Sequence, residues 1–130
     1  MSVLVGFIPT PEGRAALEAA ITEARLRDTS LVVLNASSGN SLVDPRHANA
    51  DTMADVERQL DEAGIAHTIE HRSGREPVDE IVDLAERDDV DLVVIGLRRR
   101  SPVGKLLMGS AAQRILLDVT CPVLAVKVAG

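Results

Sequence analysis

The residues best suited to chemistry lie in one short segment near the end of the chain. Four positive charges fall within eight residues, at Arg98, Arg99, Arg100 and Lys105. Gly109 and Ser110 then lead directly into a stretch with helical spacing. The free N–H groups of a helix N-terminus attract anions, and arginine side chains bind phosphate through paired hydrogen bonds. This pattern predicts a phosphate-ester site, and a solvated basic loop is the alternative that the charges alone leave open.

Ser110 also has an explanation that needs no ligand. The run from Ser110 to Gln113 matches a capping box, in which the serine hydroxyl caps the helix and the glutamine returns a hydrogen bond. Helix capping alone would therefore account for this serine.

Two standard nucleotide motifs are not present. Gly104 and Lys105 are followed by Leu106, and position 99 is Arg where a Walker A loop needs glycine, so a P-loop is excluded. Gly6 stands alone after the first apolar run, which disfavours a dinucleotide fingerprint of the Rossmann type.

Metal and thiol chemistry are also disfavoured. His67, Glu70 and His71 spell an inverted zinc-protease motif, but the segment has the character of a strand. Residues four apart in a strand are separated by roughly 13 Å, too far to share one zinc ion. The single cysteine, Cys121, cannot form an internal disulfide, and we expect a buried, inert thiol.

Composition limits the protein class. The chain has 130 residues, which suits one domain spanning residues 1–130, with 45% hydrophobic and 26% charged residues. Its net charge is −6, and it has one Phe and neither Tyr nor Trp, so we expect no nucleic-acid partner. No apolar run is long enough to span a membrane, and we expect a cytoplasmic protein.

Apolar runs and helical spacings alternate along the chain. Strands are expected at 3–8, 31–34, 65–71, 91–96 and 122–126, and helices at 12–27, 53–63, 77–85 and 112–119. The expected buried faces of the first and last helices comprise Leu17, Ala20, Ile21 and Ala24, and Ala112, Ile115, Leu116 and Val119. Such alternation predicts a single-domain α/β fold, a doubly wound, five-stranded parallel sheet with about four helices.

Ligands of doubly wound sheets bind outside the carboxyl ends of the strands, where the strand order reverses. Three expected loops are therefore candidates for a site: residues 9–11, 35–37 and 96–110. The segment 38–49, rich in loop-forming residues, either orders over a ligand or stays loose.

The last third of the chain resembles the universal stress protein family. The resemblance is strongest in the runs Asp91–Gly96, Gly109–Leu116 and Cys121–Lys127, and extends over essentially the whole chain. It implies a Rossmann-like fold of the adenine-nucleotide alpha-hydrolase type. The family's ATP signature has Gly, two residues, Gly, nine residues, then Gly with Ser or Thr. Gly96, Gly109 and Ser110 match it in frame, whereas Arg99 replaces the middle glycine.

The resemblance also implies a site and a ligand. The expected ligand is ATP, accompanied by magnesium, with adenine held by backbone groups near Asn35 and Ala36. The implied binding residues are Thr10, Ala36, Gly96, Arg99, Arg100, Gly109, Ser110 and Ala111. Ile8 stands where nucleotide-binding members have an aspartate, a second departure from the pattern.

Three candidate functions can be compared against these residues. The first is a regulatory module that binds ATP, without dedicated catalytic machinery and with at most slow hydrolysis. The alternative is a nucleotide-free interaction protein of the same family, and the family commonly forms homodimers through the last strand, here Pro122 to Val128. An adenylate-forming or pyrophosphatase enzyme is disfavoured, because the two prolines in the run from Ile8 to Pro11 remove backbone donors.

Overall fold

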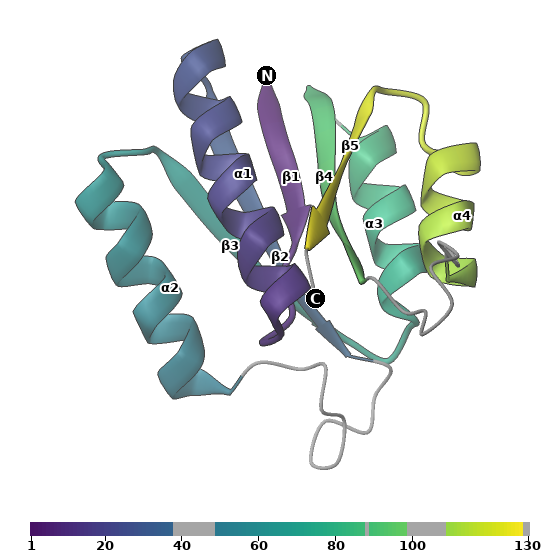
Figure 1. Cartoon of the computed structure of the whole chain (residues 1–130), viewed down its shortest axis with the longest axis horizontal. Helices are drawn as coiled ribbons and strands as arrows, with labels where there is room; N and C mark the ends of the chain where they lie inside the picture. Colours follow the sequence, from purple (N-terminus) through teal and green to yellow (C-terminus); the bar gives the residue numbers. More distant parts are fainter. Residues whose placement is uncertain (38–48, 88, 99–108, 129–130) are drawn as a thin grey trace.

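Strands and helices alternate along the chain (Figure 1). The structure, a computed structural model, describes residues 1–37, 49–87, 89–98 and 109–128. The strands are β1 (Ser2–Gly6), β2 (Ser30–Ser37), β3 (His67–Ser73), β4 (Val90–Arg98) and β5 (Val123–Val128). The helices are α1 (Pro11–Arg27), α2 (Ala50–Ala63), α3 (Pro77–Glu86) and α4 (Ser110–Asp118).

The five strands form one parallel sheet in the order β3-β2-β1-β4-β5. From β1 the chain moves outward to β2 and β3, then returns to place β4 on the other side of β1. The order therefore reverses between β1 and β4, which is where ligands bind in this class of fold. The predicted doubly wound parallel sheet with four helices is confirmed.

Two helices cover each face of the sheet. Figure 1 shows α1 and α2 on one side and α3 and α4 on the other. Alternate residues of β1 point to opposite faces: Val3 and Val5 pack with α1 and α2, whereas Leu4 packs with α3 and α4. Both faces of the central strands are buried, which explains their uninterrupted apolar runs.

Helix α1 begins with the local signals expected of an N-terminus. Thr10 is the N-cap and its hydroxyl oxygen accepts a hydrogen bond from Gly13 N at 3.1 Å, while Pro11 occupies the first helical position. The predicted buried face is confirmed, because Leu17, Ala20, Ile21 and Ala24 are all buried. Asp28, in the left-handed conformation with φ of 52°, ends the helix.

Several predicted boundaries and contacts are wrong. β2 continues through Asn35 and Ala36, which were expected in a loop, because their backbone pairs with His71 and Arg72 of β3. β4 likewise continues past Gly96 to Arg98 by pairing with β5. Leu116, predicted to face the core, is 37% exposed.

Of the helices in the described ranges, none combines the length and apolarity needed to cross a bilayer.

Candidate functional site

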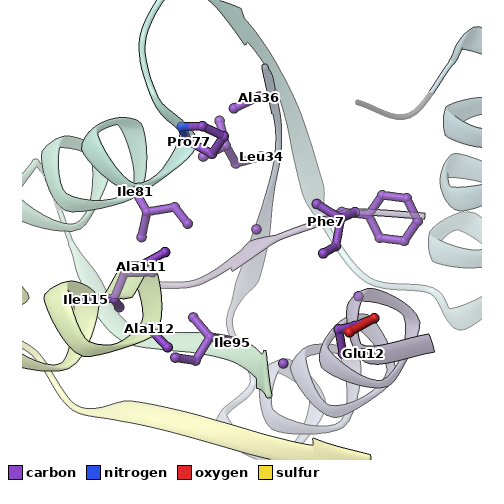
Figure 2. Close-up of a pocket in the computed structure, with 14 residues that line it drawn as sticks. Phe7, Glu12, Leu34, Ala36, Pro77, Ile81, Ile95, Ala111, Ala112 and Ile115 are labelled. Atoms are coloured by element: carbon purple, nitrogen blue, oxygen red, sulfur yellow. The ribbon is translucent and has the colours of Figure 1, made fainter. Parts of the chain in front are cut away.

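A pocket opens at the carboxyl ends of β1, β2 and β4, where the strand order reverses (Figure 2). It holds about 660 Å³ of space, including the part open to solvent. Its lining is mainly apolar and consists of Gly6, Phe7, Ile8, Glu12, Gly13, Leu34, Ala36, Pro77, Ile81, Ile95, Gly96, Ala111, Ala112 and Ile115. Such a surface suits the flat, apolar part of a small ligand.

The helices that contribute to the lining cover opposite faces of the sheet. Figure 2 shows Ile81 of α3 and Ala111 of α4 on one side of the pocket, with Phe7 and Glu12 on the other. The N-terminal turns of α1, α3 and α4 all contribute residues to the pocket. The positive ends of these three helix dipoles make this end of the sheet favourable for an anion.

Gly96 and Gly13 are required by the packing of α1. A Cβ atom on Gly96 would lie 2.1 Å from the backbone oxygen of Glu12, and one on Gly13 would lie 1.9 Å from the backbone oxygen of Ile8. Both contacts are far closer than real Cβ atoms make. The two glycines therefore let the first turn of α1 approach β4 and the end of β1. Gly96, predicted to bind a ligand, lines the pocket but has this separate structural role.

Gly109 differs from these two glycines. Its φ of −65° is accessible to any residue, and a Cβ atom there would meet no described atom within 4 Å. Neither backbone conformation nor packing in the described chain requires glycine at this position. Open space in front of a helix N-terminus is what an approaching phosphate needs.

The capping role predicted for Ser110 is wrong. The N-cap of α4 is Gly109, which makes no side-chain capping bond, and Ser110 is the first helical residue. The Gly109 carbonyl instead accepts the first helical hydrogen bond, from Gln113 N at 3.1 Å. Ser110 and Ala111 are both exposed at the start of α4, and Ala111 lines the pocket.

The other predicted binding residues fall in different places. Ala36 lines the pocket and is buried, whereas Thr10 caps α1 and is not part of the lining. Arg99 and Arg100 lie outside the described residues. The structure therefore brings Ala36, Gly96 and Ala111 to one pocket.

Glu12 is the acidic side chain in the lining, and it is not among the site residues predicted from the sequence. It is 9% exposed and lies in the first turn of α1 (Figure 2). Its position beside the pocket depends on the close approach permitted by Gly96. No local sequence signal reveals that approach, because the two residues are far apart in the chain.

Ion pairs hold the first turn of α3 beside the pocket. Glu80 is buried, and its carboxylate lies 3.3 Å from Arg75 Nη1 and 3.8 Å from Arg72 Nη1. Arg75 also contacts Asp83, and this hydrogen bond lowers the pKa of the Asp83 carboxyl. The arginines at this end of α3 are thus engaged with acids of the same chain.

The histidines of β3 have separate partners. His67 Nδ1 lies 2.9 Å from the Ile65 carbonyl oxygen, and His71 Nδ1 lies 3.4 Å from the Asn35 amide nitrogen. The predicted strand character of this segment is confirmed. Among the described residues, no three potential His, Cys, Asp or Glu ligands gather closely enough to hold a metal ion.

Cys121 lies before β5, away from the pocket lining. It is half-buried, so the burial predicted for this thiol is only partial. Burial is the main cause that raises the pKa of the thiol, and the nearby Asp91 carboxylate adds to the shift. A thiol held in its protonated form is a poor nucleophile.

Comparison with known proteins gives the family. The model of the universal stress protein family matches residues 1–127. A universal stress protein from Mycolicibacterium smegmatis is 45% identical over 128 residues, covering 98% of each chain.

Two similar solved structures contain nucleotides. A universal stress protein from Archaeoglobus fulgidus in complex with dAMP has a TM-score of 0.65 and 24% identity, covering 98% of each chain. A universal stress protein in complex with cAMP has a TM-score of 0.70 and 24% identity, covering 99% of this chain and 98% of that one. With the family match over nearly its whole length and the same arrangement of sheet and helices, this chain belongs to the universal stress protein family.

Proposed function

We propose that this protein is a regulatory module that binds an adenine nucleotide, ATP, in the pocket at the carboxyl ends of β1, β2 and β4. The observation that carries the proposal is that a Cβ atom on Gly109, at the N-terminus of α4 and beside an apolar pocket, would meet none of the described atoms within 4 Å. The dAMP and cAMP complexes of related proteins support an adenine nucleotide as the ligand class.

In this proposal the base and sugar meet an apolar surface, and the phosphates meet a helix N-terminus. The base and sugar contact the apolar lining near Ala36 and Ile95, with base hydrogen bonds supplied by the backbone. The phosphates approach the N–H groups of Gly109, Ser110 and Ala111, where the helix dipole favours negative charge. Arg99 and Arg100 would add positive charge, and magnesium would accompany the phosphates.

We propose that the nucleotide pocket has no dedicated catalytic machinery. The described lining has one acidic side chain, Glu12, and includes no histidine, cysteine, serine or lysine. A bound nucleotide would therefore act by changing the shape or partners of the protein.

We further propose a homodimer through β5, which occupies one edge of the sheet and has β4 as its neighbour there. Light scattering should give the mass of a dimer, and a monomeric mass would overturn this part.

One observation favours the second candidate, a nucleotide-free interaction protein. Ile8, an apolar side chain, lines the pocket together with the Glu12 carboxylate. An apolar lining offers no hydrogen bonds to the hydroxyl groups of a sugar, and a carboxylate repels phosphate. A measurement of binding separates the two candidates.

Calorimetric titration with ATP and magnesium tests the proposal. We expect saturable binding, and an adenine nucleotide released when the purified protein is denatured would support it. Gly109→Val should abolish binding, because its branched side chain fills the space before the helix N-terminus. Thr120→Val, at an exposed residue beyond the other end of α4, is the matched control and should bind normally. Absence of binding to the wild-type protein, or normal binding by Gly109→Val, would refute the proposed site.

A further inference from the structure

Helix α4 carries the proposed phosphate-binding amides but has a small buried surface of its own. Among its nine residues, Ile115 is buried, and Val119 follows as a buried C-cap residue. Leu116 and Leu117 are 37% and 82% exposed. The position of the helix N-terminus therefore depends strongly on each contact that α4 makes with its neighbours.

An ion pair between described residues links α4 to α3. The Arg114 guanidinium contacts the Asp79 carboxylate of α3, and its Nε atom lies 3.2 Å from Asp118 Oδ2 within α4. Of these two contacts of Arg114, the one with Asp79 joins α4 to α3, whereas the one with Asp118 stays within α4. The hydrogen bond to Asp79 is also the main cause that raises the pKa of Arg114.

Both ends of this contact lie close to the pocket. Asp79 belongs to the first turn of α3 and follows the lining residue Pro77 by two positions. Arg114 directly precedes the lining residue Ile115. The turn that carries Asp79 also carries the buried Glu80, which lies within ion-pair distance of Arg75 and Arg72. Asp79 is thus a firm attachment point for α4.

We propose that the Arg114–Asp79 ion pair is a positioning contact, which holds the N-terminal turn of α4 at the distance from α3 that nucleotide phosphates require. This inference rests on the proposed function, since it concerns the same pocket. Arg114 acts through the helix that it fixes and does not touch the ligand. Losing the pair would let α4 occupy other positions, and affinity falls in proportion to the fraction of molecules that remain competent to bind.

The expected effect is moderate because both partners are partly exposed. The side chains of Arg114 and Asp79 are 47% and 28% exposed, so solvent screens their attraction. The affinity for ATP should fall about two- to fivefold when the pair is removed, which corresponds to the range of a screened ion pair. The affinity for adenosine, which has no phosphate to meet the α4 amides, should change much less.

The test compares ATP with adenosine in a set of variants. Arg114→Ala and Asp79→Asn remove the link between the helices, and Arg114→Lys retains the charge. Asp118→Asn is the matched control, because it removes the other partner of Arg114 without affecting the contact between α3 and α4. Calorimetry gives the ATP affinity, competition against a fluorescent ATP analogue gives the adenosine affinity, and circular dichroism verifies folding.

The ratio of the two affinities decides the result. We expect the preference for ATP over adenosine to fall in Arg114→Ala and Asp79→Asn, to recover in Arg114→Lys and to stay at the wild-type value in Asp118→Asn. An unchanged ratio in the first two variants, or an equal fall in Asp118→Asn, would overturn the inference while leaving the proposed function intact. A wild-type protein that binds neither ligand would overturn both.

Discussion

Replacing Gly96 by alanine should destabilise the fold, whereas the same change at Gly109 should not. The new Cβ at position 96 would lie 2.1 Å from the Glu12 backbone oxygen and 2.7 Å from its carbonyl carbon. Both atoms belong to the main chain of α1, so no side-chain rotation relieves the overlap. The helix must move until the contact exceeds about 3 Å.

The size of the effect follows from the cost of overpacking. Forcing extra atoms into a packed core costs roughly 1–3 kcal/mol, and a rigid main-chain contact belongs at the upper end of that range. We therefore expect Gly96→Ala to lower the free energy of unfolding by about 3 kcal/mol. For a chain of this length, this corresponds to a fall of about 10 °C in Tm.

Gly109→Ala is the matched control. The added methyl group meets no described atom, so the remaining effects are a weaker N-cap and a less flexible unfolded chain. These oppose each other, and the free energy of unfolding should stay within about 1 kcal/mol of the wild type. Affinity for ATP should nevertheless decrease, because the methyl group occupies space offered to the phosphates.

Urea denaturation followed by circular dichroism measures both variants, since the chain has no Trp or Tyr to serve as a fluorescence probe. If Gly96→Ala were as stable as the wild type, the close approach of α1 to β4 would not exist as described. If Gly109→Ala lost as much stability as Gly96→Ala, Gly109 would have a packing role and the argument for an open phosphate site would fail.

Three further predictions concern local interactions. Thr10→Ala should lower the free energy of unfolding by about 1 kcal/mol, because it removes the N-cap bond to Gly13 N, and Thr10→Ser should restore most of it in urea denaturation. The Cys121 thiol should react with iodoacetamide more slowly at pH 8 than a free cysteine, because burial raises its pKa; a rate equal to that of the free amino acid would contradict this. Arg75→Ala should raise the pKa of Asp83 toward its ordinary value of 3.8. Because the folded-state pKa of Asp83 is lowered, its interaction with Arg75 stabilises the fold above pH 3.8 and is lost as the pH falls through that lower pKa. The stability difference between wild type and Arg75→Ala should therefore shrink in acid, and a difference independent of pH would exclude this interaction.

Helix faces and the alternation of elements could be predicted from the sequence because they depend on local periodicity. The buried face of α1 is an example, with Leu17 and Ile21 in the predicted positions. The strand order could not be obtained this way, since it depends on pairing between distant segments. Leu116 was misplaced because its spacing fits a buried face, whereas α4 packs through a narrower surface centred on Ile115.

At the candidate site, too, features that depend on local sequence could be predicted, and features that depend on contacts between distant residues could not. The resemblance and the glycine spacing predicted Gly96 and Ala36, and both line the pocket. The roles of Glu12 and Gly96 in packing α1 could not be predicted, because each depends on a contact between residues more than eighty positions apart. Ser110 was predicted as a cap from a four-residue motif, but α4 begins one residue earlier than that motif requires.

The central place of β1 in the sheet has a consequence for synthesis on the ribosome. β1 is the first of the described strands to be made, yet it pairs with β4 on one side, and β4 begins only at Val90. At about 5–20 residues per second, this second neighbour is made roughly 5–20 s after β1. During that interval β1 presents an unpaired apolar edge, the kind of surface through which nascent chains aggregate. Protection of the growing chain by a chaperone, and not the stability of the finished domain, would then limit the yield of folded protein.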